Sequence, residues 1–224
     1  MFLTQSSAGK NQIWRYLATL IATLTAFVAG HIPLIAIVKI YALKGGFDGP
    51  ELDQMLETGG LDQIGVGTNL GLIVMLVPFA VALAVLLPCV RVLHARSMLS
   101  VLTSRAKFDL GRVGFAALIW LTLAGGSILL AIPSELISVQ FEVSKFLPLL
   151  VIALLLLPLQ VAAEEILFRG YILQGAARLF GRPFWPLTIV TIAFAVVHLA
   201  NPEFVNGFAS IAPIYMVLSL FFGL

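Results

Sequence analysis

Residues 147–169 read LPLLVIALLLLPLQVAAEEILFR. This stretch is apolar and carries no charge before Glu164, and it approaches the roughly 20 residues that an α-helix needs to cross a bilayer. Two carboxylates, Glu164 and Glu165, and one cation, Arg169, follow directly. A carboxylate in or near hydrocarbon is costly unless it is paired or hydrated, so it usually marks a functional site. The stretch therefore predicts a membrane helix that leads into such a site.

The composition extends the membrane prediction to the whole chain. Hydrophobic residues make up 60% of its 224 residues and charged residues 11%, and the mean hydropathy is +1.06. Soluble domains carry about 25% charged residues, so we expect membrane lipid to be the main solvent of this chain. The net charge of +2 gives no indication of nucleic-acid binding. A single cysteine, Cys89, excludes an internal disulfide and is interpreted as a packing residue.

Apolar segments of nearly membrane-spanning length recur along the chain. They cover residues 17–42, 69–89, 114–132, a stretch from 147 onward, 184–199 and 208–224. Helices are expected because a backbone in lipid must satisfy its own hydrogen bonds, and no segment alternates like a barrel strand. The first segment is too long for a signal peptide. The predicted fold is an all-α bundle of about six transmembrane helices. Within this one membrane domain, residues 1–146 form a three-helix region and residues 147–224 carry the motifs.

The segments between the apolar runs alternate in charge. The loop after the second run is basic, with Arg91, Arg96, Arg105, Lys107 and Arg112 against Asp109. Loops rich in Lys and Arg stay on the cytoplasmic side, so the alternation predicts a cytoplasmic N-terminus. We interpret these basic residues as determinants of topology that contact anionic lipid, without a catalytic role. His94 lies in the same loop and is expected to be solvated.

The spacing of the charged residues at 164–169 predicts a division of roles. Glu165 and Arg169 are four residues apart and can pair on one helix face, whereas Glu164 is rotated by about 100° and points elsewhere. An apolar pocket raises the pKa of a carboxyl group and a nearby arginine lowers it, which together can set a general base near neutral pH. The alternative interpretation is an interfacial ion pair that ends the helix.

A histidine in the next apolar segment is placed to meet Glu164. His198 and Phe194 are four residues apart, and the turn between the two helices is expected at residues 181–183. Glu164 lies 17 residues before Gly181 and His198 lies 17 residues after it, so an antiparallel hairpin puts both at similar depth. This geometry requires the fourth helix to continue past Gly170 toward Phe180, or to bend there. The two side chains can form a base with its orienting partner, or two ligands of a divalent metal such as Zn²⁺. Alone, His198 can also be a packing residue.

The combined motif resembles a known family. Glu164-Glu165-Ile166-Leu167-Phe168-Arg169-Gly170, followed by Phe194-Ala195-Val196-Val197-His198, resembles the first two motifs of the CPBP intramembrane endopeptidases, also known as the Abi or CAAX-prenyl-protease-like family. The resemblance implies an all-helical fold with a cavity open to the membrane, and hydrolysis of a membrane-associated peptide or protein. It implies that Glu164 activates water, that Arg169 and Glu165 form a supporting ion pair, and that His198 positions the water or binds a metal.

One family feature has no counterpart in the sequence. The family's further motif, a histidine followed by Asn or Asp on a later helix, does not occur before Leu224, and His31 lies in the wrong region to replace it. We therefore expect a C-terminally incomplete family member, in either an active or an inactive form, in a bacterial inner membrane. The alternatives are a proton-coupled transporter and a non-catalytic, immunity-type membrane protein. Nothing in the sequence indicates an oligomeric state.

Overall fold

The computed structural model describes residues 5, 7–46, 65–131, 141–181, 184–198, 213 and 217. Over these residues the chain is helical and contains no strand. The elements are α1 (Ile13–Gly30), α2 (Ile32–Gly45), α4 (Thr68–Leu93), η2 (Met98–Val101), α5 (Leu110–Ala131), α6 (Val143–Glu165), η4 (Ile166–Ile172), α7 (Leu173–Phe180) and α8 (Phe184–His198). The predicted all-α membrane class is confirmed. Apart from residues 213 and 217, the sixth predicted segment, 208–224, lies outside the described residues.

Four helical stretches are long and apolar enough to cross a membrane. They are Ile13–Gly45, Thr68–Leu93, Leu110–Leu130 and Val143–Phe180. The shorter apolar helix α8 follows the last of them. These stretches agree with the first four predicted segments. A long apolar segment in lipid must satisfy its own backbone hydrogen bonds, so its hydropathy and length suffice to predict a helix.

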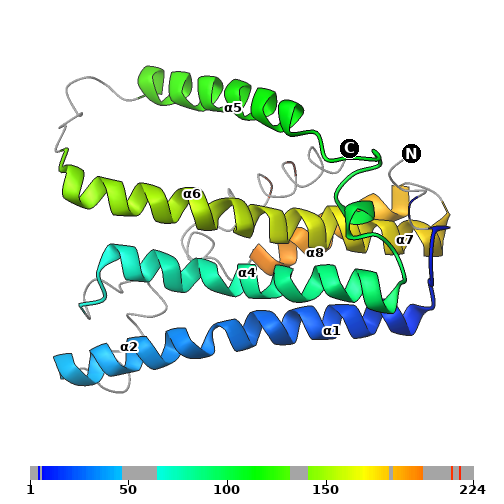
Figure 1. Cartoon of the computed structure of the whole chain (residues 1–224), viewed down its shortest axis with the longest axis horizontal. Coiled ribbons are helices and arrows are strands. Elements are labelled where there is room, and N and C mark those ends of the chain that lie inside the picture. Colours follow the sequence, from blue (N-terminus) through cyan, green and yellow to red (C-terminus); the bar gives the residue numbers. More distant parts are fainter. Residues whose placement is uncertain are drawn as a thin grey trace.

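Helix α4 lies between α1 and α6 (Figure 1). The first segment is broken at His31, which separates α1 from α2 and precedes Pro33. Gly30 at this break lies against Pro78 of α4, where an added Cβ would come within 2.8 Å of the Pro78 Cα. The small residue thus allows α1 and α4 to approach closely at their helix-breaking positions.

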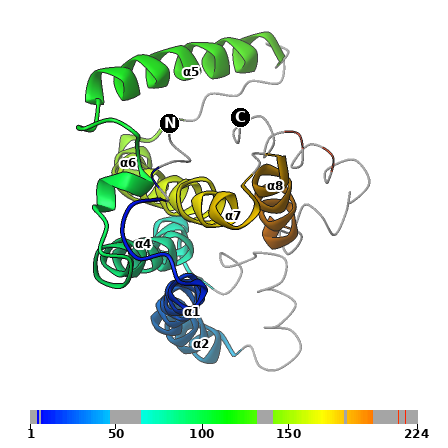
Figure 2. The ribbon, with the colours of Figure 1, turned by 90° about the vertical axis from the view of Figure 1, so that its right-hand side faces the viewer.

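Helices α6, η4 and α7 form one continuous rod from Val143 to Phe180. Its middle part, η4, is a π-helical turn of seven residues. The rod ends at Gly181, whose φ of +67° is a conformation that glycine adopts without strain. Helix α8 then packs against α7 and η4 (Figure 2). The pairing of Glu164 with His198 called for a helix that continues past Gly170 or bends there, and the structure shows the continued helix.

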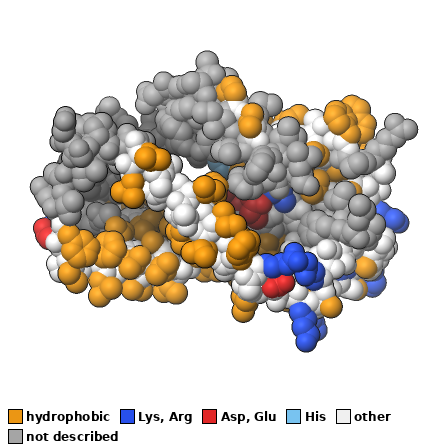
Figure 3. Space-filling model, turned by 90° about the horizontal axis from the view of Figure 1, so that it is seen from above, with side chains coloured by type: hydrophobic (Ala, Val, Ile, Leu, Met, Phe, Trp, Pro, Cys, Tyr) orange, Lys and Arg blue, Asp and Glu red, His pale blue; other side chains and the backbone are white. Residues whose placement is uncertain are grey.

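Much of the outer surface is apolar, as expected for a protein in lipid. Hydrophobic side chains cover a large part of the face in Figure 3, while the basic ones gather toward one end. In the membrane-spanning part of α5 no residue is buried, and Trp120, Leu123 and Leu130 are exposed. The core lies where α4, η2 and η4 meet, around Leu86, Val90, Val101, Ile166 and Tyr171.

The expectation that His94 is solvated is wrong. Its side chain is fully buried, and Arg96 in the same loop is only 5% exposed. The His94 Nε2 lies 2.7 Å from the hydroxyl oxygen of Tyr171, and its Nδ1 lies 2.9 Å from the Lys10 carbonyl oxygen. The loop folds inward because the N-terminal segment and η4 supply these polar partners.

Candidate active site

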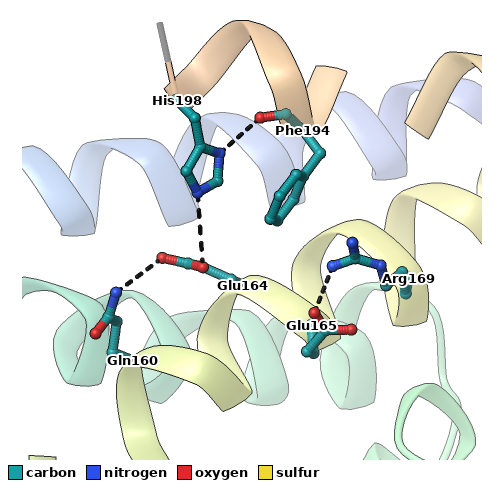
Figure 4. Close-up of polar contacts among 6 residues, drawn as sticks. All are labelled: Gln160, Glu164, Glu165, Arg169, Phe194 and His198. Carbon is teal, nitrogen blue, oxygen red and sulfur yellow. Dashed lines mark hydrogen bonds and ion pairs between the residues drawn. The ribbon is translucent and has the colours of Figure 1, made fainter. Parts of the chain in front are cut away.

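Glu164 and His198 come from different helices and face each other (Figure 4). The Glu164 Oε2 and the His198 Nε2 are 4.0 Å apart, and the two side chains are 21% and 14% exposed. Glu164 lies near the end of α6, and His198 is the last residue of α8. The predicted meeting of these two side chains is confirmed. Their catalytic roles remain predictions.

The backbone of α8 determines which nitrogen of His198 carries a proton. The His198 Nδ1 lies 2.7 Å from the carbonyl oxygen of Phe194. Because a carbonyl oxygen only accepts hydrogen bonds, Nδ1 must donate, and the Nε2 of a neutral imidazole then presents its lone pair toward Glu164. With a neutral ring and an ionised Glu164, both facing atoms are acceptors, so a hydrogen donor must lie between them. A water molecule that donates to both groups meets this requirement.

A third residue, Gln160, orients the Glu164 carboxylate. Its Nε2 donates to the Glu164 Oε1 at 3.2 Å, which leaves Oε2 directed toward His198 (Figure 4). Sequence reasoning missed Gln160. The signal that could have found it is its position four residues before Glu164, on the same helix face.

The predicted pair of Glu165 and Arg169 is also present. The Arg169 Nη1 donates to the Glu165 Oε1. The guanidinium group lies over the ring of Phe194, with 4.4 Å between its carbon and the ring centroid. Phe194 therefore has two contacts in the site, because its ring meets Arg169 and its carbonyl oxygen holds His198.

A cavity of about 330 Å³ gives Glu164 and His198 a common space. Both line it, together with Ala163, Leu167, Phe168 and Val197. Its opposite wall is nearly all apolar and comes from α1 and α4, with Thr23, Leu24, Phe27, Phe79, Ala82, Leu83 and Leu86. An ionisable pair in an otherwise apolar cavity is typical of a site for chemistry or binding.

The residues present fit a catalytic zinc site only in part. Zinc in hydrolases takes three protein ligands and keeps a fourth position for water. Glu164 and His198 are close enough to share an ion. However, the described part of the chain has no group of three His, Cys, Asp or Glu side chains that could hold a metal. The described residues thus supply two ligands of the three, and the predicted zinc ion remains an expectation.

Comparison with known proteins agrees with this geometry. Residues 145–224, which contain Glu164, Arg169 and His198, match the family model of the type II CAAX prenyl endopeptidases, Rce1-like. Over these residues the chain is similar to the Rce1-like family. The resemblance to CAAX-prenyl-protease-like endopeptidases is thereby confirmed for residues 145–224.

A curated relative extends the similarity toward the N-terminus. The chain is 32% identical over 202 residues to the uncharacterized protein YyaK of Bacillus subtilis (strain 168). The alignment covers 89% of this chain, and the chain spans 65% of the length of that relative. No solved structure matches the chain.

Proposed function

We propose that this Rce1-like protein hydrolyses a peptide bond in a membrane-associated substrate, with Glu164 as the general base. The observation that carries the proposal is the 4.0 Å gap between the Glu164 Oε2 and the His198 Nε2 at the wall of an apolar cavity. This gap suits one water molecule that donates a hydrogen bond to each group. Its oxygen lone pair can then point into the cavity, where a substrate carbonyl carbon would lie.

In the proposed hydrolysis, Glu164 and His198 each accept one hydrogen of the attacking water. As the water oxygen attacks the carbonyl carbon, its proton passes to Glu164 and the carbonyl π bond opens to an oxyanion. Glu164 then gives this proton to the amide nitrogen, and the C–N bond breaks to release an amine and a carboxylic acid. His198 holds the water by accepting its second hydrogen, and Gln160 keeps the carboxylate oriented. General-base catalysis of this kind contributes about 10²–10⁴-fold to the rate.

The ion pair of Glu165 and Arg169 stabilises the position of Phe194 and, through it, of His198. Arg169 is nearly buried and its guanidinium lies over the ring of Phe194, and Phe194 orients His198 through its carbonyl oxygen. The apolar wall from α1 and α4 suits an apolar substrate side chain, because it offers contact area without polar groups that require partners.

The decisive variant is Glu164→Gln, which keeps the shape of the side chain and removes the base. The protein is reconstituted in lipid nanodiscs with a pool of lipid-anchored peptides, and the products are identified by mass spectrometry. We expect cleavage to fall by about 10²-fold or more, because an amide cannot accept the water proton. Glu142→Gln is the matched control, since Glu142 is an exposed carboxylate paired with Lys145 outside the site.

Cleavage by Glu164→Gln at the wild-type rate would remove Glu164 from the mechanism. Circular dichroism and gel filtration show whether each variant is folded. If the wild-type protein cuts no peptide but takes up solute in a pH-dependent way in liposomes, and Glu164→Gln abolishes this uptake, the transporter alternative replaces the endopeptidase.

A further inference from the structure

A buried polar cluster joins the basic loop to the helix that carries Glu164. His94 and Tyr171 are 0% and 1% exposed, and the Tyr171 hydroxyl lies 2.7 Å from the His94 Nε2. The ring of Tyr16 on α1 packs against both, with centroid distances of 4.5 Å to His94 and 5.3 Å to Tyr171. None of these three residues lines the cavity of Glu164 and His198.

The donors and acceptors in this cluster are fixed by chemistry. The His94 Nδ1 must donate to the Lys10 carbonyl oxygen, which only accepts. The neutral ring then presents the Nε2 lone pair, and the Tyr171 hydroxyl donates to it. One neutral imidazole thus connects the N-terminal segment with η4.

The hydrogen bond from Tyr171 to His94 attaches to η4 next to the candidate active site. Tyr171 belongs to the same π-helical turn as Arg169, and Glu165 directly precedes that turn. A π turn departs from ordinary helix geometry, so contacts outside the helix must hold it, and such turns are frequent at functional sites. A second buried contact lies one turn further along, where Arg96 donates to the Gln174 Oε1 at 2.9 Å. Gln174 in turn donates to the Ser100 carbonyl oxygen at 2.8 Å.

We propose that His94 and Tyr171 are positioning residues that hold η4, and with it Glu164, Glu165 and Arg169, in the arrangement needed for catalysis. This inference rests on the proposed function. The neutral His94 accepts the hydrogen bond of Tyr171, and this bond fixes the helical rod that carries the general base Glu164.

The charges around His94 favour the neutral ring. Arg96 in its own loop and Arg15 on α1 are cations, while Tyr16 on α1 and Tyr171 on η4 are neutral hydroxyl-bearing partners. Burial lowers the pKa of His94 from its ordinary value, and the two arginines act in the same direction. Because the unfolded chain binds the proton more readily, the contribution of this contact is complete above about pH 6.5 and is lost as the pH falls below it.

The first test compares two hydroxyl deletions in the same cluster. Tyr171→Phe removes the hydrogen bond to His94, whereas Tyr16→Phe removes a hydroxyl that donates to Asn11 and not to η4. For Tyr171→Phe in nanodiscs we expect kcat to fall about tenfold with an unchanged KM, because the base is misplaced while the substrate cavity stays intact. Amide hydrogen exchange over residues 164–172 should become faster. Tyr16→Phe should change neither quantity.

The second test uses His94. In His94→Gln a side-chain carbonyl can still accept from Tyr171 but cannot be protonated, so we expect kcat and amide exchange near wild type at pH 7.5. Between pH 7.5 and 5.5 the protection factors of residues 164–172, which are exchange rates corrected for their intrinsic pH dependence, should fall in the wild type and stay constant in His94→Gln. His94→Leu, which lacks an acceptor, should behave like Tyr171→Phe.

Wild-type kcat and wild-type exchange in Tyr171→Phe overturn the proposal, and so does an effect confined to KM. If the wild-type protein cleaves no peptide, the proposed function fails, while the exchange of residues 164–172 still decides whether His94 and Tyr171 hold the turn.

Discussion

At the scale of single residues, Phe194 links the two ionisable pairs of the site. Its ring lies under the Arg169 guanidinium at 4.4 Å and within 4.2 Å of the His198 ring centroid. Its carbonyl oxygen fixes the His198 Nδ1. A displacement of Arg169 would therefore move Phe194 and, with it, the His198 ring, although Arg169 and His198 belong to different helices.

We predict an energetic coupling between Arg169 and Phe194. Arg169→Lys replaces a flat, delocalised cation by a compact one, and Phe194→Leu removes the aromatic face, so each change should lower thermal stability in detergent. A double-mutant cycle should give a coupling of about 1–2 kcal/mol, as expected for a cation–π contact away from water. The same cycle with Arg178→Lys, on the exposed end of the rod, is the control and should be additive. Additivity for Arg169 and Phe194 as well would contradict the coupling.

Sequence spacing predicted the main contacts of the site but not all of them. The four-residue spacing identified the pair of Glu165 and Arg169, and equal distances from Gly181 identified the meeting of Glu164 and His198. The burial of His94 was not predictable in this way, because its partners Lys10 and Tyr171 are distant in sequence and only the packed fold brings them to it.

At the scale of elements, the close contact of η2 with η4 depends on a glycine. A Cβ added to Gly170 would lie 2.3 Å from the carbonyl oxygen of Val101. The backbone of η4 can therefore touch the loop that carries His94 and Arg96 only without a side chain at position 170. The pairing of Glu164 with His198 predicted that the rod continues past Gly170. It did not predict the π turn, because that turn is fixed by contacts with α4 and η2 rather than by local preference.

Gly170→Ala is the variant that tests this contact. We expect it to lower stability by about 1–3 kcal/mol, the usual cost of overpacking, and to reduce cleavage because η4 must shift away from Val101. Thermal unfolding in detergent and the peptide cleavage assay measure the two effects. Gly114→Ala in α5 is the matched control, since a Cβ there meets nothing within 4 Å. Equal behaviour of the two variants would show that η2 and η4 separate without cost.

At the scale of the whole molecule, the rod from Val143 to Phe180 is too long for the bilayer. Its 38 residues span about 57 Å at 1.5 Å per residue, against about 30 Å of hydrocarbon. Glu164 lies 21 residues after Val143, about 32 Å along the rod. If Val143 lies at one boundary of the hydrocarbon, Glu164 lies close to the other, at the end where the N-terminal segment and the basic loop meet. This placement lets water reach the site while the substrate stays in the membrane.

The orientation of this end of the molecule in the membrane follows from its charges. The N-terminal segment and the basic loop lie together, because the Lys10 amide donates to the His94 carbonyl oxygen at 2.8 Å, whereas the start of α6 lies at the opposite end (Figure 1). Since Lys/Arg-rich loops stay inside, we predict that the shared end is cytoplasmic. In a Cys89→Ala background, Ala8→Cys and Ser104→Cys should react with an impermeant maleimide only in inverted vesicles, and Ser144→Cys only in intact cells. Labelling of Ala8→Cys and Ser144→Cys from the same side would contradict both the predicted topology and the position of Glu164 near the cytoplasmic boundary.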